Sequence, residues 1–184
     1  MLTNIQKLKV GLAAVGALAV LVLTPAGASA NCGGGGVTPA EVDICTPTPK
    51  AHLLASGRLI PPAGAPARVK AVIAAANRIR TKPYVWGGGH ARWWDNGYDC
   101  SGSVSFALHG GGFLESPLPS GPMERWGSPG KGRWITVYAN AGHAYAVIAG
   151  FRWDTAGDFS GTGPRWHPQM LSNRGFVARH PLGF

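Results

Sequence analysis

Residues 98–104 read Tyr98-Asp99-Cys100-Ser101-Gly102-Ser103-Val104, and they begin the element around which we expect the fold to form. Apolar and small residues continue to His109, and three glycines follow, so the pattern predicts a short helix from Asp99 or Cys100 to His109. Asp99 suits the N-cap, because its carboxylate can accept hydrogen bonds from the first turn. Cys100 would then occupy that turn, where unpaired N–H groups and the helix dipole favour a thiolate.

The segments on either side of this helix indicate the fold class. Upstream, apolar residues recur at helical spacing from Ala67 to Arg80, and Lys82-Pro83 ends that pattern. Downstream, β-branched and aromatic residues predict short strands, which we place at 133–138, 143–148, 151–155 and 175–180. Helices followed by antiparallel strands are typical of an α+β domain.

The first 30 residues have the order of a secretory signal peptide. Lys7 and Lys9 precede an uncharged, mostly apolar run from Val10 to Leu23, and Ala28-Ser29-Ala30 supplies small residues for cleavage. The run is shorter than the roughly 20 residues that span a bilayer. We therefore expect a bacterial protein that is secreted or held in the cell wall. Its contact with the membrane would be through the signal peptide alone, before cleavage.

Residues 31–66 are predicted to be a Gly/Pro-rich linker, because glycine and proline runs there disfavour helices. A short apolar patch, 52–54, is the part of it expected to dock on the domain. We expect the folded domain to begin near Ala67 and to occupy residues 67–184.

Charge and cysteine content narrow the function classes. The 184 residues include 17 Lys+Arg and 8 Asp+Glu, a net charge of +9 that falls to +7 when Lys7 and Lys9 leave with the signal. An exported basic protein meets anionic wall polymers rather than nucleic acid. Cys32 and Cys45 can close a loop in an oxidising compartment, which leaves Cys100 as an odd thiol. Neither a structural zinc site nor a catalytic metal cluster is indicated, and no cofactor is expected.

A cysteine nucleophile needs a base, and His143 is the best placed of six histidines because it opens an apolar strand. If the chain reverses just after Ile148, Asp154 lies opposite His143 and can orient the imidazole. His167 is the alternative for this third role. Each residue also has a structural interpretation. Cys100 can be a small buried hydrophobe and His143 a surface histidine, while Asp154 can be the ion-pair partner of Arg152 or Arg165.

Taken together, three stretches resemble the NlpC-type cell-wall cysteine peptidases, which are papain-like endopeptidases. They are 82–88 (Lys-Pro-Tyr-Val-Trp-Gly-Gly), 98–104, and Gly142-His143 with its apolar strand. The resemblance covers roughly Ala67 to Thr155. It implies a papain-like core with N-terminal helices packed on an antiparallel sheet.

The same resemblance implies roles for individual residues. Cys100 would be the nucleophile, His143 the general base and Asp154 the third catalytic residue, where the family usually has His, Asn or Gln. Tyr84, Asp99 and Ser101 would bind substrate, Tyr84 through a hydroxyl that reaches the nucleophile. The chain departs from the family pattern at Gly132-Arg133-Trp134 and at Tyr145.

The function expected is cleavage of amide bonds in peptidoglycan stem peptides through a Cys-His-Asp triad. Two alternatives stay open on the same scaffold: an N-acetylmuramoyl-L-alanine amidase, and a catalytically inactive wall-binding protein. A serine hydrolase using Ser101 is remote, because the chain has no G-x-S-x-G motif.

Overall fold

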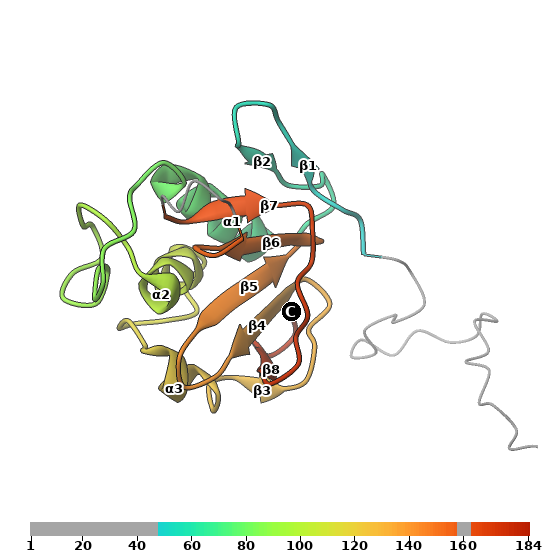
Figure 1. The fold of residues 1–184 in the computed structure, drawn as a ribbon. Helices are drawn as coiled ribbons and strands as arrows, with labels where there is room; N and C mark the ends of the chain where they lie inside the picture. Colours follow the sequence, from blue (N-terminus) through green and yellow to red (C-terminus); the bar gives the residue numbers. More distant parts are fainter. Residues whose placement is uncertain (1–47, 158–162) are drawn as a thin grey trace, which may run out of the picture. The chain divides into compact units, whose positions relative to one another are not determined.

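The computed structural model describes residues 48–157 and 163–184. The predicted signal peptide and the predicted Cys32–Cys45 disulfide lie outside these residues. A six-stranded sheet, in which every paired strand is antiparallel, forms the centre of the fold (Figure 1). Its strand order is β3-β8-β4-β5-β6-β7. The strands are β3 Ser128–Pro129, β4 Ile135–Ala139, β5 Ala144–Ile148, β6 Phe151–Asp154, β7 Arg165–His167 and β8 Val177–His180.

Three helices accompany the sheet: α1 Ala67–Ile79, α2 Cys100–Gly110 and the short α3 Ser120–Met123. The apolar stripe of α1 is buried, and α1 packs on α2 so closely that a Cβ on Gly110 would overlap the side chain of Ala75. Helix α2 is buried from Ser101 to Leu108. The predicted positions of α1 and α2 are confirmed to within about one residue at each end.

The two faces of the sheet differ in what covers them. Trp153 lies opposite Ala146, and its indole Nε1–H donates to the carbonyl of Ser103 in α2 at 3.1 Å. This face is therefore packed against the helices. Tyr138 and Tyr145 pair across β4 and β5 on the other face. The expectation of an α+β fold with helices packed on an antiparallel sheet is confirmed.

The β5–β6 register differs from the prediction. Ala149 and Gly150 form the turn, both with positive φ (46° and 83°), so Ile148 pairs with Phe151. Asp154 consequently lies opposite Tyr145, and the predicted pairing with His143 is wrong by two residues. The chain reverses one residue later than we assumed. A slip of two residues keeps a side chain on the same face, so His143 and Asp154 still share one.

The folded part begins earlier than predicted. A hairpin of β1 His52–Leu53 and β2 Leu59–Ile60 precedes α1, and Leu59 is fully buried. The backbone N–H and C=O of Leu59 bond the side-chain amide of Asn77 in α1, at 2.9 and 2.8 Å. The predicted start of the folded domain near Ala67 is thus wrong, because residues 51–65 already contain a buried leucine. Their proline and glycine content favoured a linker in the sequence prediction.

Three further elements were not predicted, namely the short helix α3 and the edge strands β3 and β7. Their two to four residues are too few to show a periodic pattern in the sequence. None of the helices in residues 48–157 and 163–184 has the length and apolar character needed to cross a bilayer.

Candidate active site

Cys100 is the first residue of α2, as predicted. Asp99 has the extended backbone of an N-cap (φ −85°, ψ −175°), and its Oδ1 accepts the N–H of Gly102 at 2.7 Å. The thiol is partly buried. This position surrounds the sulfur with unpaired backbone N–H groups at the positive end of a helix.

His143 lies directly before β5 and faces Cys100. Its backbone N–H donates to Asn140 Oδ1 at 2.9 Å, and its carbonyl accepts from the Asn140 N–H at 3.0 Å, so a tight turn fixes its position. Its Nε2 lies 2.9 Å from Asp154 Oδ1. The other ring nitrogen, Nδ1, is left for the hydrogen bond that joins the imidazole to the Cys100 thiol.

The thiol and the imidazole shift each other's pKa toward the charged pair. Burial is the largest single effect on Cys100 and raises its pKa. The hydrogen bonds from His143 and from the Ala144 N–H, with the charge of His143, outweigh burial and hold that pKa below its usual value. For His143, burial lowers the pKa, but bonding to Asp154 and Cys100 and their negative charges raise it to about 9. Each group therefore favours the charged form of the other, the thiolate of Cys100 and the imidazolium of His143.

Asp154 has two cationic neighbours. It is 1% exposed, and its Oδ2 accepts from Arg152 Nη1 while its Oδ1 accepts from His143 and from the Ala156 N–H at 3.0 Å. Asp154 thus bonds both His143 and Arg152, so it is the ion-pair partner of Arg152 and also has the contact that the triad prediction requires. His167, the alternative third residue, is buried on β7 opposite Arg152, and the bond to His143 is made by Asp154.

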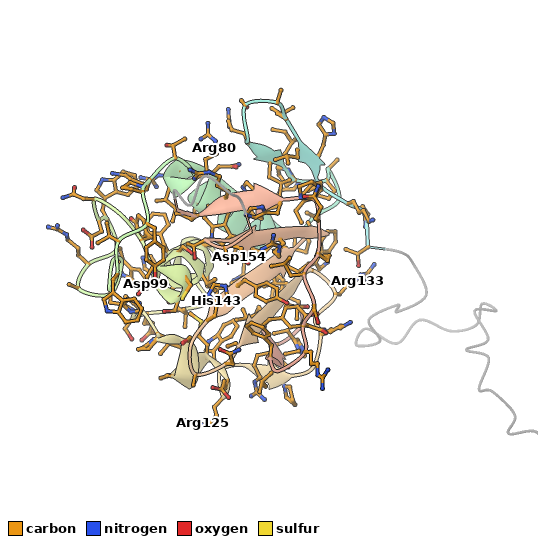
Figure 2. The ribbon with its side chains drawn as sticks, viewed as in Figure 1. Arg80, Asp99, Arg125, Arg133, His143 and Asp154 are labelled. Atoms are coloured by element: carbon orange, nitrogen blue, oxygen red, sulfur yellow. The ribbon has the colours of Figure 1, made fainter. Side chains whose placement is uncertain are left out.

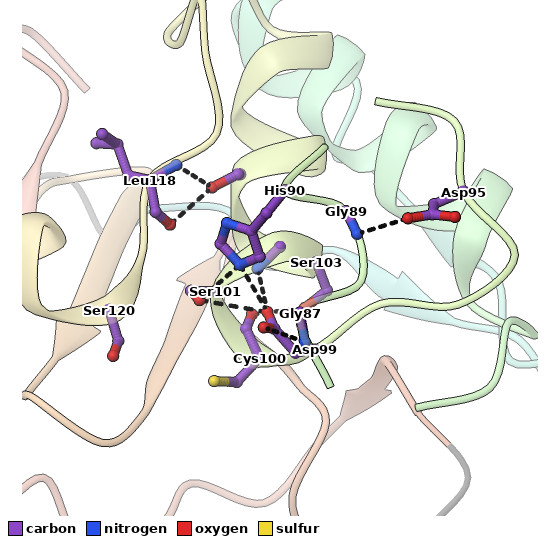
Figure 3. Close-up of polar contacts among 12 residues, drawn as sticks. Gly87, Gly89, His90, Asp95, Asp99, Cys100, Ser101, Ser103, Leu118 and Ser120 are labelled. Carbon is purple, nitrogen blue, oxygen red and sulfur yellow. Dashed lines mark hydrogen bonds and ion pairs between the residues drawn. The ribbon is translucent and has the colours of Figure 1, made fainter. Parts of the chain in front are cut away.

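Asp99 and Ser101, the predicted substrate-binding residues, belong to a polar cluster beside the thiol (Figure 3). His90 Nε2 lies 3.0 Å from Asp99 Oδ1 and 3.2 Å from Ser101 Oγ, and Asp99 Oδ2 accepts the Gly87 N–H at 3.1 Å. The Cys100 sulfur points away from this cluster. We assigned His90 no role from the sequence, in which its position in the glycine loop before the Asp-Cys-Ser motif was the only available signal.

Glycines allow the 84–90 loop to lie directly on the start of α2. The Asp99 N–H donates to the Gly88 carbonyl at 3.2 Å, and a Cβ on Gly102 would overlap that same carbonyl oxygen. The loop brings Tyr84 close to the thiol. Burial, followed by the charges of Cys100 and Asp99, raises the Tyr84 pKa, so its hydroxyl stays protonated.

The structure therefore brings Cys100, His143 and Asp154 into one hydrogen-bonded chain, with Tyr84 near the thiol and with Asp99 and Ser101 in the polar cluster from which the sulfur points away. Figure 2 shows Asp99, His143 and Asp154 near one another. No group of three or more His, Cys, Asp or Glu residues within 48–157 and 163–184 is arranged to hold a metal ion.

Comparisons with known proteins give one similar structure to report. No family model matches the sequence, and no curated protein matches it. The chain is similar to the solved structure of the peptidoglycan hydrolase RipB from Mycobacterium tuberculosis. The two are 28% identical over 65% of this chain and 68% of that chain, with a TM-score of 0.49.

Proposed function

We propose that the protein is a secreted cell-wall hydrolase, a cysteine endopeptidase that cleaves amide bonds in peptidoglycan stem peptides. The observation that carries the proposal is the chain of hydrogen bonds from Cys100 through His143 to Asp154 at the start of a buried helix. A thiol paired with an imidazole, which a carboxylate orients, is the arrangement that nucleophilic catalysis requires.

Each member of the chain has a defined part in the reaction. The Cys100 thiolate attacks the amide carbonyl, and the His143 imidazolium gives its Nδ1 proton to the departing amine, which leaves a thioester on Cys100. A water molecule then loses a proton to His143 and attacks the thioester, releasing the carboxylic acid and the thiol. Asp154 holds the ring so that Nδ1 faces the sulfur, and its charge stabilises the imidazolium.

Donors for the developing oxyanion are available beside the thiol. The backbone N–H of Cys100, at the first position of α2, has no acceptor within the helix. The Tyr84 hydroxyl is a neutral donor near the sulfur, because its pKa is raised. Both would stabilise negative charge on the carbonyl oxygen during attack.

The substrate class is supported by the sequence motifs and by the chemistry around the thiol. The 82–88, 98–104 and Gly142-His143 stretches are those of peptidases that cut stem peptides. Asp99 supplies a carboxylate next to the nucleophile, which suits the amine-bearing end of such a peptide, and Ser101 lies beside it. Export by the predicted signal peptide would deliver the enzyme to this substrate.

Digestion of purified peptidoglycan tests the proposal. The mature protein should release peptide fragments cut within the stem, and Cys100→Ala should release none while keeping the same circular dichroism spectrum. Mass spectrometry separates the alternatives, because an amidase frees whole stem peptides from the sugar. Identical products from the two proteins would refute catalysis by Cys100, and an absence of products from both would leave the wall-binding interpretation.

A further inference from the structure

A second concave site lies on the face of the sheet that α2 does not cover. It is a cavity of about 490 Å³, within the size range of small-ligand sites. Its floor is formed by Thr136 and Tyr138 of β4 with Tyr145 and Val147 of β5, and residues 170–173 form another wall. These last residues belong to the segment between β7 and β8, which runs beside the sheet in Figure 1. The Cys100 thiol does not line this cavity.

The floor carries two tyrosine hydroxyls without protein partners. Tyr138 and Tyr145 are only 7% and 3% exposed, and their rings stack with centroids 4.9 Å apart. Within the described part of the chain, neither hydroxyl makes a hydrogen bond. Neither hydroxyl oxygen is among the fully buried side-chain atoms that lack a partner, so both are accessible from the cavity and can donate to an acceptor from outside the chain.

The Tyr145 hydroxyl is suited to donate rather than to ionise. Burial, followed by the charges of Tyr138 and Asp154, raises the pKa of Tyr145 to about 12, so the group keeps its proton under all physiological conditions. The charge of Asp154 would repel an anion, but Arg152 is paired with Asp154 and offsets it. The floor is thus a neutral surface with two hydrogen-bond donors.

The rim of the cavity is cationic. Lys50, Lys131 and Arg133 line it, and none of the described lining residues is acidic. Figure 2 shows Arg133 well apart from His143 and Asp154. Two lysines beside two hydroxyl donors form a site complementary to an oxyanion.

We propose that this cavity binds a phosphate group, with the hydroxyls of Tyr138 and Tyr145 donating to its oxygens and the rim cations neutralising its charge. Phosphate fits better than a carboxylate, because the two lysines exceed what a single carboxylate charge requires and phosphate offers more acceptor oxygens. A phosphate-bearing wall polymer bound here would hold the protein at the cell wall. The proposal goes beyond the proposed hydrolase function and does not depend on it.

Binding of inorganic phosphate tests the site directly. The mature Cys100→Ala protein is used, because this substitution removes catalysis from the measurement. Titration with inorganic phosphate at constant ionic strength, followed by NMR shifts or calorimetry, should show saturable binding. Replacing both tyrosines by phenylalanine keeps the stacked rings and removes only the hydroxyls. This Tyr138→Phe/Tyr145→Phe variant should weaken phosphate binding by about tenfold or more.

Two double variants test how much the charges of the rim lysines contribute to phosphate binding. Lys50→Gln with Lys131→Gln should weaken binding by roughly two- to fivefold for each lysine. Arg58→Gln with Arg125→Gln removes the same charge from exposed positions outside the cavity and should leave binding unchanged.

Three results would overturn the proposal. These are an absence of saturable phosphate binding, equal affinity in the phenylalanine variant, and acetate binding as tightly as phosphate. A soluble glycerol phosphate oligomer, compared with a carboxylate-bearing stem peptide, then identifies the source of the group. Tighter binding of the peptide would contradict the assignment to a phosphate polymer.

Discussion

Replacing Asp154 by asparagine separates the charge of this residue from its shape. The carboxylate bonds His143 Nε2 at 2.9 Å and lies 99% buried, so its charge acts on the imidazole with little screening. Without that charge, the pKa of His143 falls from about 9 toward the usual histidine value of 6.5. The fall corresponds to at most about 3 to 4 kcal/mol, since each pKa unit is worth about 1.4 kcal/mol. This is an upper limit, because Cys100 also raises the pKa of His143.

The sign of the effect on reactivity follows from the ion pair. The imidazolium that stabilises the thiolate is present below the pKa of His143 and is lost as the pH rises through it. In Asp154→Asn the alkaline limit of the ion pair therefore moves to lower pH, and the thiol pKa rises. At pH 7 we expect the alkylation rate of Cys100 and kcat/KM to fall by up to about a hundredfold.

The assay is the rate of Cys100 alkylation by iodoacetamide between pH 4 and 10, read by peptide mapping so that Cys32 and Cys45 do not contribute. Asp95→Asn is the matched control, because Asp95 bonds the Gly89 N–H and Arg92 but not His143. It should keep the wild-type profile. An Asp154→Asn profile that coincides with the wild type would refute the coupling between Asp154 and the thiol.

Three further outcomes follow from the structure. In the wild type, peptidoglycan cleavage should be lost as the pH rises through about 9, because His143 then loses its proton. A cleavage rate that still increases above pH 10 would contradict the thiolate–imidazolium ion pair. Leu59→Ala should lower the free energy of unfolding by about 2–5 kcal/mol, because Leu59 is fully buried. Ile60, on the same strand, is 39% exposed, so Ile60→Ala should cost less than about 1 kcal/mol. Equal small losses in denaturant titrations would show that the hairpin does not unfold together with the rest of the domain. Gly102→Ala should lower the free energy of unfolding by about 1–3 kcal/mol and slow Cys100 alkylation, because the added Cβ would overlap the Gly88 backbone. Gly121→Ala, whose Cβ would lie in open space, should do neither. A Gly102→Ala protein with wild-type stability would show that the loop can move away.

Local signals made the helical half of the site predictable. Helix α2 and its cap were evident because Asp99, the small residues after it and the glycine run act within a few residues of one another. His143 stood out because a polar residue preceded an apolar strand. These features depend on short-range chemistry that the order of residues displays directly.

Features set by distant contacts were not predictable. The β5–β6 register depended on whether Ala149 would accept a positive φ, and the residue type gave no warning of it. His90 acquires its role through Asp99 and Ser101, which reach it only when the loop folds onto α2. Leu59 is buried because Asn77 of α1 satisfies its backbone, a contact across 18 residues.

The most direct test of the account is a titration of activity against alkylation of Cys100. Samples alkylated to different extents are assayed on purified peptidoglycan, and the modified fraction of Cys100 is measured in each by mass spectrometry. If the Cys100 thiolate is the nucleophile, residual activity falls in proportion to that fraction and reaches zero at complete modification. Activity that persists when Cys100 is fully alkylated would contradict the central claim.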